Sequence, residues 1–155
     1  MPAEQYHVLH AKHNLDFLKS FYTSYKFNDW AITVSFYAVL HIVEYVISYG
    51  NISYQGNKIN IRHSSQFVNA IRNLRQVPLP KNLLSISEHI ARKYIVNENF
   101  EKIAEDYNTL YNNAQTARYQ QYSVQKHVAF LLVEISLKNI VDWCNGKFHT
   151  KFTLP

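Results

Sequence analysis

The apolar residues of this chain recur mainly at spacings of three and four, the repeat of an amphipathic α-helix. The first such segment covers about residues 3–25, and its predicted buried stripe is Asn14, Leu18, Phe21 and Tyr25. The second covers about residues 28–49 and is apolar on most sides, which predicts a central position in a bundle. Asn28 or Asp29 is predicted to cap its start and Gly50 to end it.

A polar stretch at 51–61, with Gly56 and Asn57, is predicted to be a surface loop, and strand patterns are nearly absent. Further helices are expected at about 63–76, 82–94, 97–122 and 123–145. Pro78 and Pro80 end the first of these, and Gly146 ends the last. The pattern therefore predicts an all-α protein, an antiparallel up-and-down bundle of four to five helices over 1–146. The tail, 147–155, is expected to be a short extended arm or disordered.

Composition agrees with one helical domain. The chain has 155 residues, is 47% hydrophobic, and contains only 3 Gly and 4 Pro, so it can bury a core and has few helix breakers. Its 12 tyrosines indicate either a core with polar edges or a contact surface. A formal net charge of +5 permits weak attraction to RNA or another anionic partner, and is equally compatible with a merely basic surface.

The expected location is the cytoplasm. Cys144 is the only cysteine, so no disulfide can form within the chain. Glu4 and further polar residues up to Lys12 interrupt any signal-peptide pattern. The longest apolar stretch, 31–47, contains a histidine and a glutamate and is interpreted as too short and too polar to span a membrane.

His7, His10 and His13 are spaced by three residues in the first helix, which raises a metal-site interpretation. At this spacing the third imidazole rotates away from the first, so exposed histidines are the more ordinary interpretation. No carboxylate cluster suits Mg²⁺, no glycine-rich phosphate loop occurs, and Cys144 lacks the surroundings of an activated thiol. Neither a metal nor another cofactor is predicted.

Four positions are better candidates for chemistry. His41 and Glu44 lie one turn apart and can pair, either as a general base with its orienting carboxylate or as a structural polar pair. His63, preceded by Arg62, stands at a loop-to-helix junction and is placed to face a cleft. Arg118 could hold a phosphate in a planar fork or could cap the carbonyls at its helix end.

The order of several short motifs resembles a group of small HEPN-domain proteins over about residues 6–119. The matching pieces are Ala11-Lys12-His13-Asn14, Asp29-Trp30-Ala31, Phe36-Tyr37-Ala38 followed by His41 and Glu44, then His63, Tyr107-Asn108-Thr109-Leu110 and Ala117-Arg118-Tyr119. Many HEPN proteins carry an Arg-x(4–6)-His motif. In this chain no arginine has a histidine five to seven residues downstream, and Ser64, Ser65 and Gln66 follow His63 where the resemblance leads one to expect an arginine.

The resemblance implies a helical bundle, frequent homodimers, and roles in RNA cleavage, toxin–antitoxin pairs and antiviral defence. It implies metal-independent catalysis by His41, His63 and Arg118. The binding residues that it implies are His13, Asn14, Tyr37, Glu44, Arg62 and Tyr119.

Three functions are therefore expected as alternatives. The first is RNA or nucleotide binding with RNA cleavage, in which an imidazole accepts the 2′-hydroxyl proton and Arg118 holds the phosphate charge. The second is a non-catalytic subunit, antitoxin-like or accessory, that binds a protein partner; the missing arginine–histidine motif favours it. The third is a small-molecule or nucleotide pocket between the helices.

Overall fold

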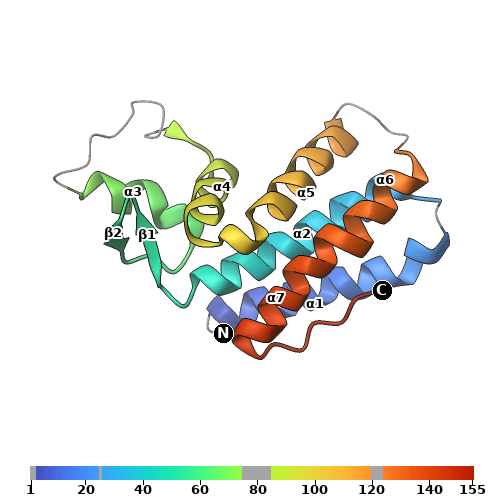
Figure 1. Ribbon diagram of the computed structural model, residues 1–155, viewed down its shortest axis with the longest axis horizontal. Coiled ribbons are helices and arrows are strands. Elements are labelled where there is room, and N and C mark those ends of the chain that lie inside the picture. Colours follow the sequence, from blue (N-terminus) through green and yellow to red (C-terminus); the bar gives the residue numbers. More distant parts are fainter. Residues whose placement is uncertain (1–2, 25, 75–84, 120–123) are drawn as a thin grey trace.

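Helix α2 (Asn28–Ile47) is the centre of the fold in the computed structural model, which describes residues 3–24, 26–74, 85–119 and 124–155. Helix α1 (Ala3–Phe21), followed by the 3₁₀ turn η1 (Tyr22–Ser24), runs antiparallel beside α2, and α5 (Glu101–Tyr119) packs on another side (Figure 1). Most α2 side chains are buried, because the helix is surrounded by packed neighbours. The predicted all-α bundle with a central second helix is confirmed. The stripe predicted for the first helix is correct only at Leu18, because the helix turns a neighbouring face to the core: Ala11, Leu15 and Tyr22 are buried, Asn14 and Phe21 are half-buried, and Tyr25 lies outside the described part.

The last predicted helix is one continuous rod of three segments: α6 (Lys126–Leu131), the π-helical turn η4 (Leu132–Leu137) and α7 (Lys138–Phe148). The prediction that Gly146 ends this helix is wrong: the rod continues through Gly146 to Phe148, because the left-handed residue that ends it is His149, with φ of 53°. The tail after it is an extended arm. Asn145 holds the arm through the backbone of Phe152, accepting from its N–H at 3.0 Å and donating to its carbonyl at 2.9 Å. Phe152 is buried and Lys19 of α1 donates to the Thr153 hydroxyl at 2.6 Å, so the arm lies along the bundle.

The predicted loop at 51–61 is wrong in one respect, because it contains a small antiparallel hairpin. Strands β1 (Ile52–Tyr54) and β2 (Asn57–Ile59) pair with Tyr54 opposite Asn57, which leaves a two-residue turn. Gln55 and Gly56 both have positive φ, 47° and 76°, as a type I′ hairpin turn requires. Gln-Gly is a weaker turn signal than Asn-Gly, and each strand has only three residues, so the local sequence indicates this hairpin only weakly.

Helix boundaries between 63 and 101 also differ from the prediction. Instead of one helix over 63–76, the chain forms the 3₁₀ turn η2 (Ser64–Gln66) and the short α3 (Phe67–Arg72); residues 75–76 lie outside the described part. Helix α4 runs over Glu88–Asn99, not 82–94, because Ser87 caps it by accepting from the N–H of Ile90 at 3.4 Å. Residues 82–84 again lie outside the described part.

The start of α2 lacks the predicted side-chain cap. Its N-cap residue is Phe27, and Asn28 donates instead to the carbonyl of Val124, 96 positions away, which ties α2 to the entry of α6. Gly50 lies just beyond the end of α2, as predicted, with φ of +78°. Within the described residues, α2 is long and apolar enough to cross a membrane, but 83% of that 18-residue stretch is buried inside the protein, as is usual for a central core helix.

Candidate functional site

Four histidines from three separate segments form what we call the imidazole cluster: His7, His10, His41 and His63. His7 and His10 project from one face of α1, and His41 from the facing side of α2. The Nδ1 atoms of His7 and His41 lie 3.1 Å apart, and the His10 and His41 ring centroids 4.9 Å apart. His63 stacks on His7 at 5.5 Å, so His7 contacts both His41 and His63.

The turn that carries His63 is fixed against the end of α2. Arg62 donates to the carbonyl of Ser48 at 2.6 Å, and its guanidinium fills the space where a Cβ at Gly50 would stand. Ser64 is fully buried, and both its N–H, at 3.0 Å, and its hydroxyl donate to Glu44. These contacts place the His63 ring with Nε2 3.7 Å from Glu44 Oε2.

A buried ion pair lies beneath the cluster. Glu44 is 0% exposed and Arg92 is 1% exposed, and Arg92 Nε donates to Glu44 Oε1 at 2.7 Å. Arg92 also donates to Glu88 at 2.5 Å and contacts His89 Nδ1 at 3.3 Å. Two buried charges this close are stable only when both are paired and hydrogen-bonded, which this network provides.

Burial and neighbouring charges shift the acid–base properties of the cluster. Burial is the main reason that the pKa of His41 falls to about 4, and His7, His10 and Arg92 lower it further. Burial likewise lowers the pKa of His7, partly opposed by Glu44. Burial alone raises the pKa of Glu44, but Arg92, the Ser64 hydrogen bonds and His63 outweigh it and hold that pKa below its usual value. His7 and His41 are therefore neutral imidazoles near neutral pH, next to an ionised carboxylate.

The cluster opens to solvent at Tyr6, which is 46% exposed. Its ring centroid lies 4.2 Å from that of His10 and 6.1 Å from that of His41. Beside this opening, Leu9, His10 and His13 line a shallow hollow of about 290 Å³. An exposed aromatic ring next to imidazoles is a surface on which an unstacked base can lie.

The structure brings some of the predicted site residues together and separates others. His63 faces Glu44, and His41 is connected to both through His7. The direct pair expected between His41 and Glu44 does not form, because Glu44 pairs with Ser64 and Arg92. Arg118 lies against Tyr37, one turn before His41: its Nη1 donates to the Tyr37 hydroxyl at 2.8 Å and its guanidinium covers the ring.

The other predicted binding residues whose side chains the structure describes lie outside the contacts of the imidazole cluster. His13 is exposed at the edge of the shallow hollow, and Asn14 is half-buried on α1. Arg62 binds the end of α2. Tyr119 is the last residue of α5, and its side chain lies outside the described part.

Three site residues were not predicted: Arg92, Ser64 and His7 in its present role. The spacing of His7 relates it only to the other α1 histidines, whereas its neighbours in the fold lie 34 and more positions away. Arg92 sits three residues after His89 in an ordinary helical sequence, so no local signal marks it. One feature of the sequence does indicate burial: Arg92 has the helical spacing of the apolar face of α4, which Ala91, Ile95 and Val96 form.

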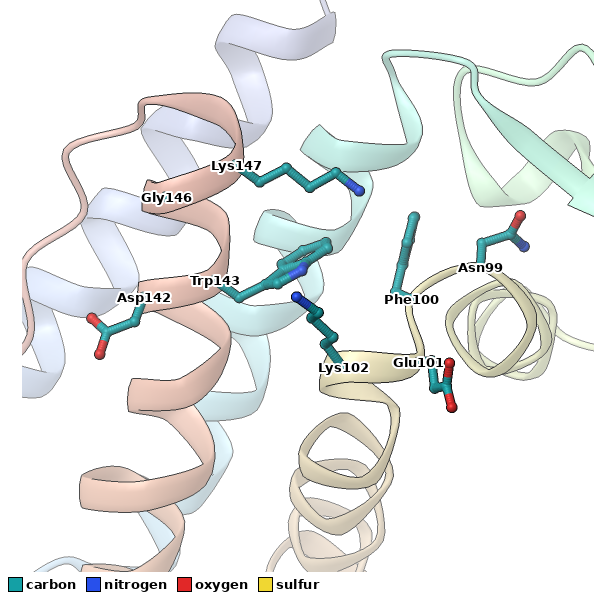
Figure 2. A pocket seen from close by; sticks show the side chains of 8 residues that line it. All are labelled: Asn99, Phe100, Glu101, Lys102, Asp142, Trp143, Gly146 and Lys147. Atoms are coloured by element: carbon teal, nitrogen blue, oxygen red, sulfur yellow. The ribbon is translucent and has the colours of Figure 1, made fainter.

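Two other surface features are distinct from the cluster. Figure 2 shows a wider hollow of about 550 Å³ between the start of α5 and α7, where the rings of Phe100 and Trp143 lie 5.6 Å apart and Lys102 and Lys147 flank them. Lys147 lies over Trp143 at 5.4 Å. At the far end of the α1–α2 pair, four aromatic rings form what we call the aromatic patch, a hollow of about 310 Å³: Phe17, Phe21, Phe27 and Trp30.

No family model, curated protein or solved structure matches this chain.

Proposed function

We propose that this chain is a HEPN-like, RNA-binding protein whose imidazole cluster cleaves single-stranded RNA without a metal. The observation that carries the proposal is the contact of His7 with both His41 and His63, beside the exposed ring of Tyr6. Two imidazoles within reach of one another are the groups needed to take a proton from one oxygen and give one to another. Two members of the cluster, His41 and His63, are also positions on which the HEPN resemblance rests. A cytoplasmic role in defence or in a toxin–antitoxin pair follows from that resemblance.

The proposed reaction is an internal phosphoryl transfer. An RNA 2′-hydroxyl gives its proton to His63, its oxygen bonds to the adjacent phosphorus, and the bond from phosphorus to the 5′-oxygen breaks. The leaving oxygen takes a proton from the His7–His41 pair, which has gained that one extra proton from solvent when the phosphate bound, so the pair returns to its neutral form. The products are a 2′,3′-cyclic phosphate and a 5′-hydroxyl, so atoms and charge balance.

The surroundings of His63 suit the role of base. Its Nε2 faces the carboxylate of Glu44, which stabilises the positive charge that the ring gains with the proton. Its Nδ1 lies 2.8 Å from the Ser65 hydroxyl and accepts from the Ser65 N–H at 3.2 Å, so it carries the unprotonated lone pair and is the atom that would take the proton in place of that N–H. A phosphate bound at the cluster would in turn favour a proton on the His7–His41 pair, because an anion stabilises an imidazolium. Arg118, held on Tyr37 one turn away, is the proposed partner of the phosphate charge.

The test is incubation of tag-free protein with fluorescent single-stranded RNA in EDTA. We expect cleavage that leaves a 2′,3′-cyclic phosphate, and no cleavage of the DNA of the same sequence, which lacks the 2′-hydroxyl. His63→Asn should lower the rate about 100-fold or more, as expected for loss of a general base, because it removes the imidazole while an amide oxygen can still cap η2.

His127→Ala is the matched control, because His127 is an exposed histidine on α6 outside the cluster. It should cleave at the wild-type rate. If purified wild-type protein cleaves no faster than His63→Asn, the catalytic proposal fails.

A second candidate function, a non-catalytic protein-binding subunit, is favoured by the aromatic patch. Phe27 is 52% exposed and Trp30 is 56% exposed, and such rings are enriched where proteins bind one another. A second copy of the chain is the partner that the HEPN resemblance favours. Light scattering after size exclusion tests this: Trp30→Ser should convert a homodimer to a monomer, and a monomeric wild-type protein would exclude the dimer.

A further inference from the structure

We infer that His7, Glu44 and His63 form a binding site for a divalent transition-metal cation of the zinc class, and that the bound cation switches the imidazole cluster off. The binding site rests on geometry alone. Only the inhibitory effect rests on the proposed RNA cleavage.

The three residues come from three segments that the fold brings to one point. Each offers one ligand atom, and these atoms all lie within 4.8 Å of one another. In a tetrahedral zinc site with ligand bonds of about 2.0–2.1 Å, neighbouring ligand atoms lie about 3.3 Å apart. Each pair of ligand atoms therefore needs to approach by at most about 1.5 Å to reach the spacing of a zinc site. Small rotations about the side-chain bonds can supply this movement.

Glu44 can supply an oxygen without losing its structural role. Its Oε1 is occupied by Arg92 and the Ser64 hydroxyl. Its Oε2 accepts from the Ser64 N–H at 3.0 Å and has a second lone pair on the side of His63 Nε2, 3.7 Å away. One carboxylate oxygen is thus fixed by the protein and the other can reach a cation, as in sites where outer hydrogen bonds orient the ligand.

The two histidines have the partners that metal-binding imidazoles use. A ligating imidazole normally donates its other N–H to a neighbouring acceptor. In the free protein His63 Nδ1 accepts from the Ser65 N–H at 3.2 Å. A cation on Nε2 would move the ring proton to Nδ1, which would then release that N–H and donate to the Ser65 hydroxyl at 2.8 Å. His7 can donate from Nδ1 to Nδ1 of His41 at 3.1 Å, which leaves the His7 Nε2 lone pair available. His41 is then a positioning residue for His7.

The charge and the ligand types select the cation. With neutral imidazoles, the local charges are those of Glu44, Glu88 and Arg92, which sum to one negative charge and tolerate a dication. Two nitrogens and one oxygen suit Zn²⁺ or Co²⁺, whereas Mg²⁺ prefers oxygen ligands alone. Three protein ligands leave a coordination position for water.

Binding would inhibit RNA cleavage because it uses the same atoms. With the cation on Nε2 and a proton on Nδ1, His63 has no lone pair to accept the 2′-hydroxyl proton. His7 is likewise withdrawn from the pair that protonates the leaving oxygen. Addition of Zn²⁺ to protein that cleaves RNA in EDTA should stop the cleavage, and an excess of EDTA should restore it.

The experiment for the site itself is titration of tag-free, metal-stripped protein with Co²⁺, followed by visible absorption. We expect one saturable equivalent with the intense bands of four- or five-coordinate Co²⁺, displaced by Zn²⁺ but not by Mg²⁺. His63→Asn and His7→Gln should each weaken binding by about 100-fold or more. His127→Ala should bind as the wild type does, and circular dichroism should show that all variants are folded.

Weak binding that does not saturate, or binding that both cluster variants retain, would overturn the inference. The RNA assay stands apart from this result. A protein that binds Co²⁺ through these residues but leaves RNA intact keeps the metal site and loses the proposed function. A protein that cleaves RNA but binds no Co²⁺ keeps the proposed function and loses the metal site.

Discussion

The two ends of the α1–α2 pair differ in chemistry although the same two antiparallel helices form both. Where the start of α1 meets the end of α2, His7 and His41 lie over the buried Glu44–Arg92 pair. Where the end of α1 meets the start of α2, the rings of Phe17 and Trp30 are about half exposed around an apolar hollow. One end is polar and largely covered, and the other is apolar and open.

The difference lies in what packs on each end. The turn η2 and helix α4 cover the polar end and supply Ser64 and Arg92, whose hydrogen bonds to both oxygens of Glu44 stabilise the buried carboxylate. The aromatic patch requires no such partners, because its uncharged rings remain in contact with water, as many apolar side chains on protein surfaces do. Stability should therefore depend steeply on the polar end and weakly on the aromatic patch.

The largest expected effect is on Glu44. Glu44→Gln removes the buried carboxylate that pairs with Arg92 and leaves the guanidinium with only the partly exposed Glu88, and breaking a buried ion pair in this way costs about 3–5 kcal/mol. Urea unfolding should show this loss in the free energy of unfolding. Asp142→Asn is the control, because its pair with Lys138 is exposed, and it should change stability by less than about 1 kcal/mol. Equal effects of the two substitutions would contradict the role given to the buried pair.

An intermediate effect is expected at Gly50. Gly50→Ala should cost about 1–2 kcal/mol, because alanine is disfavoured at the φ of +78° and its Cβ would stand 2.9 Å from the Arg62 guanidinium. Thermal unfolding measures the loss. Gly146→Ala is the control: Gly146 lies within α7 with open space around it, so alanine should stabilise the protein by up to about 1 kcal/mol. The same sign for both substitutions would be inconsistent with this account.

The smallest effect on stability is expected at the aromatic patch. Trp30→Ser should change the free energy of unfolding by no more than about 0.5 kcal/mol, because more than half of the side chain is already exposed. Urea unfolding at low protein concentration checks this without a contribution from any dimer. A loss comparable to that of Glu44→Gln would show that the patch belongs to the core, and would remove the contrast between the two ends.

Much of the helical architecture could be predicted from the sequence, because helix formation depends on spacings within about two turns. The apolar repeat located α1, α2, α5 and the long C-terminal rod. The region between 51 and 101 was predicted less well. Its elements are short, so caps and tertiary contacts decide their limits: Ser87 sets the start of α4, and Asn99 holds the hairpin by accepting from the Ser53 N–H at 2.7 Å.

The candidate site was predicted in part. His41, His63 and Glu44 stood out because they are polar residues at helical or junction positions, and the fold does bring them together. The metal-site interpretation was tied to the spacing of His7, His10 and His13 along one helix. The set that the structure offers takes only His7 from that helix and two residues from elsewhere.

The sequence by itself determined that this protein is an all-α bundle with a buried second helix, since local periodicity encodes both properties. The tertiary structure alone decided which imidazoles meet and what satisfies Glu44. Those contacts join residues 34 positions apart, as in His7 and His41, and 48 apart, as in Glu44 and Arg92. Local spacing carries no information about such pairs, because they form only when packed helices bring distant side chains within a few ångströms.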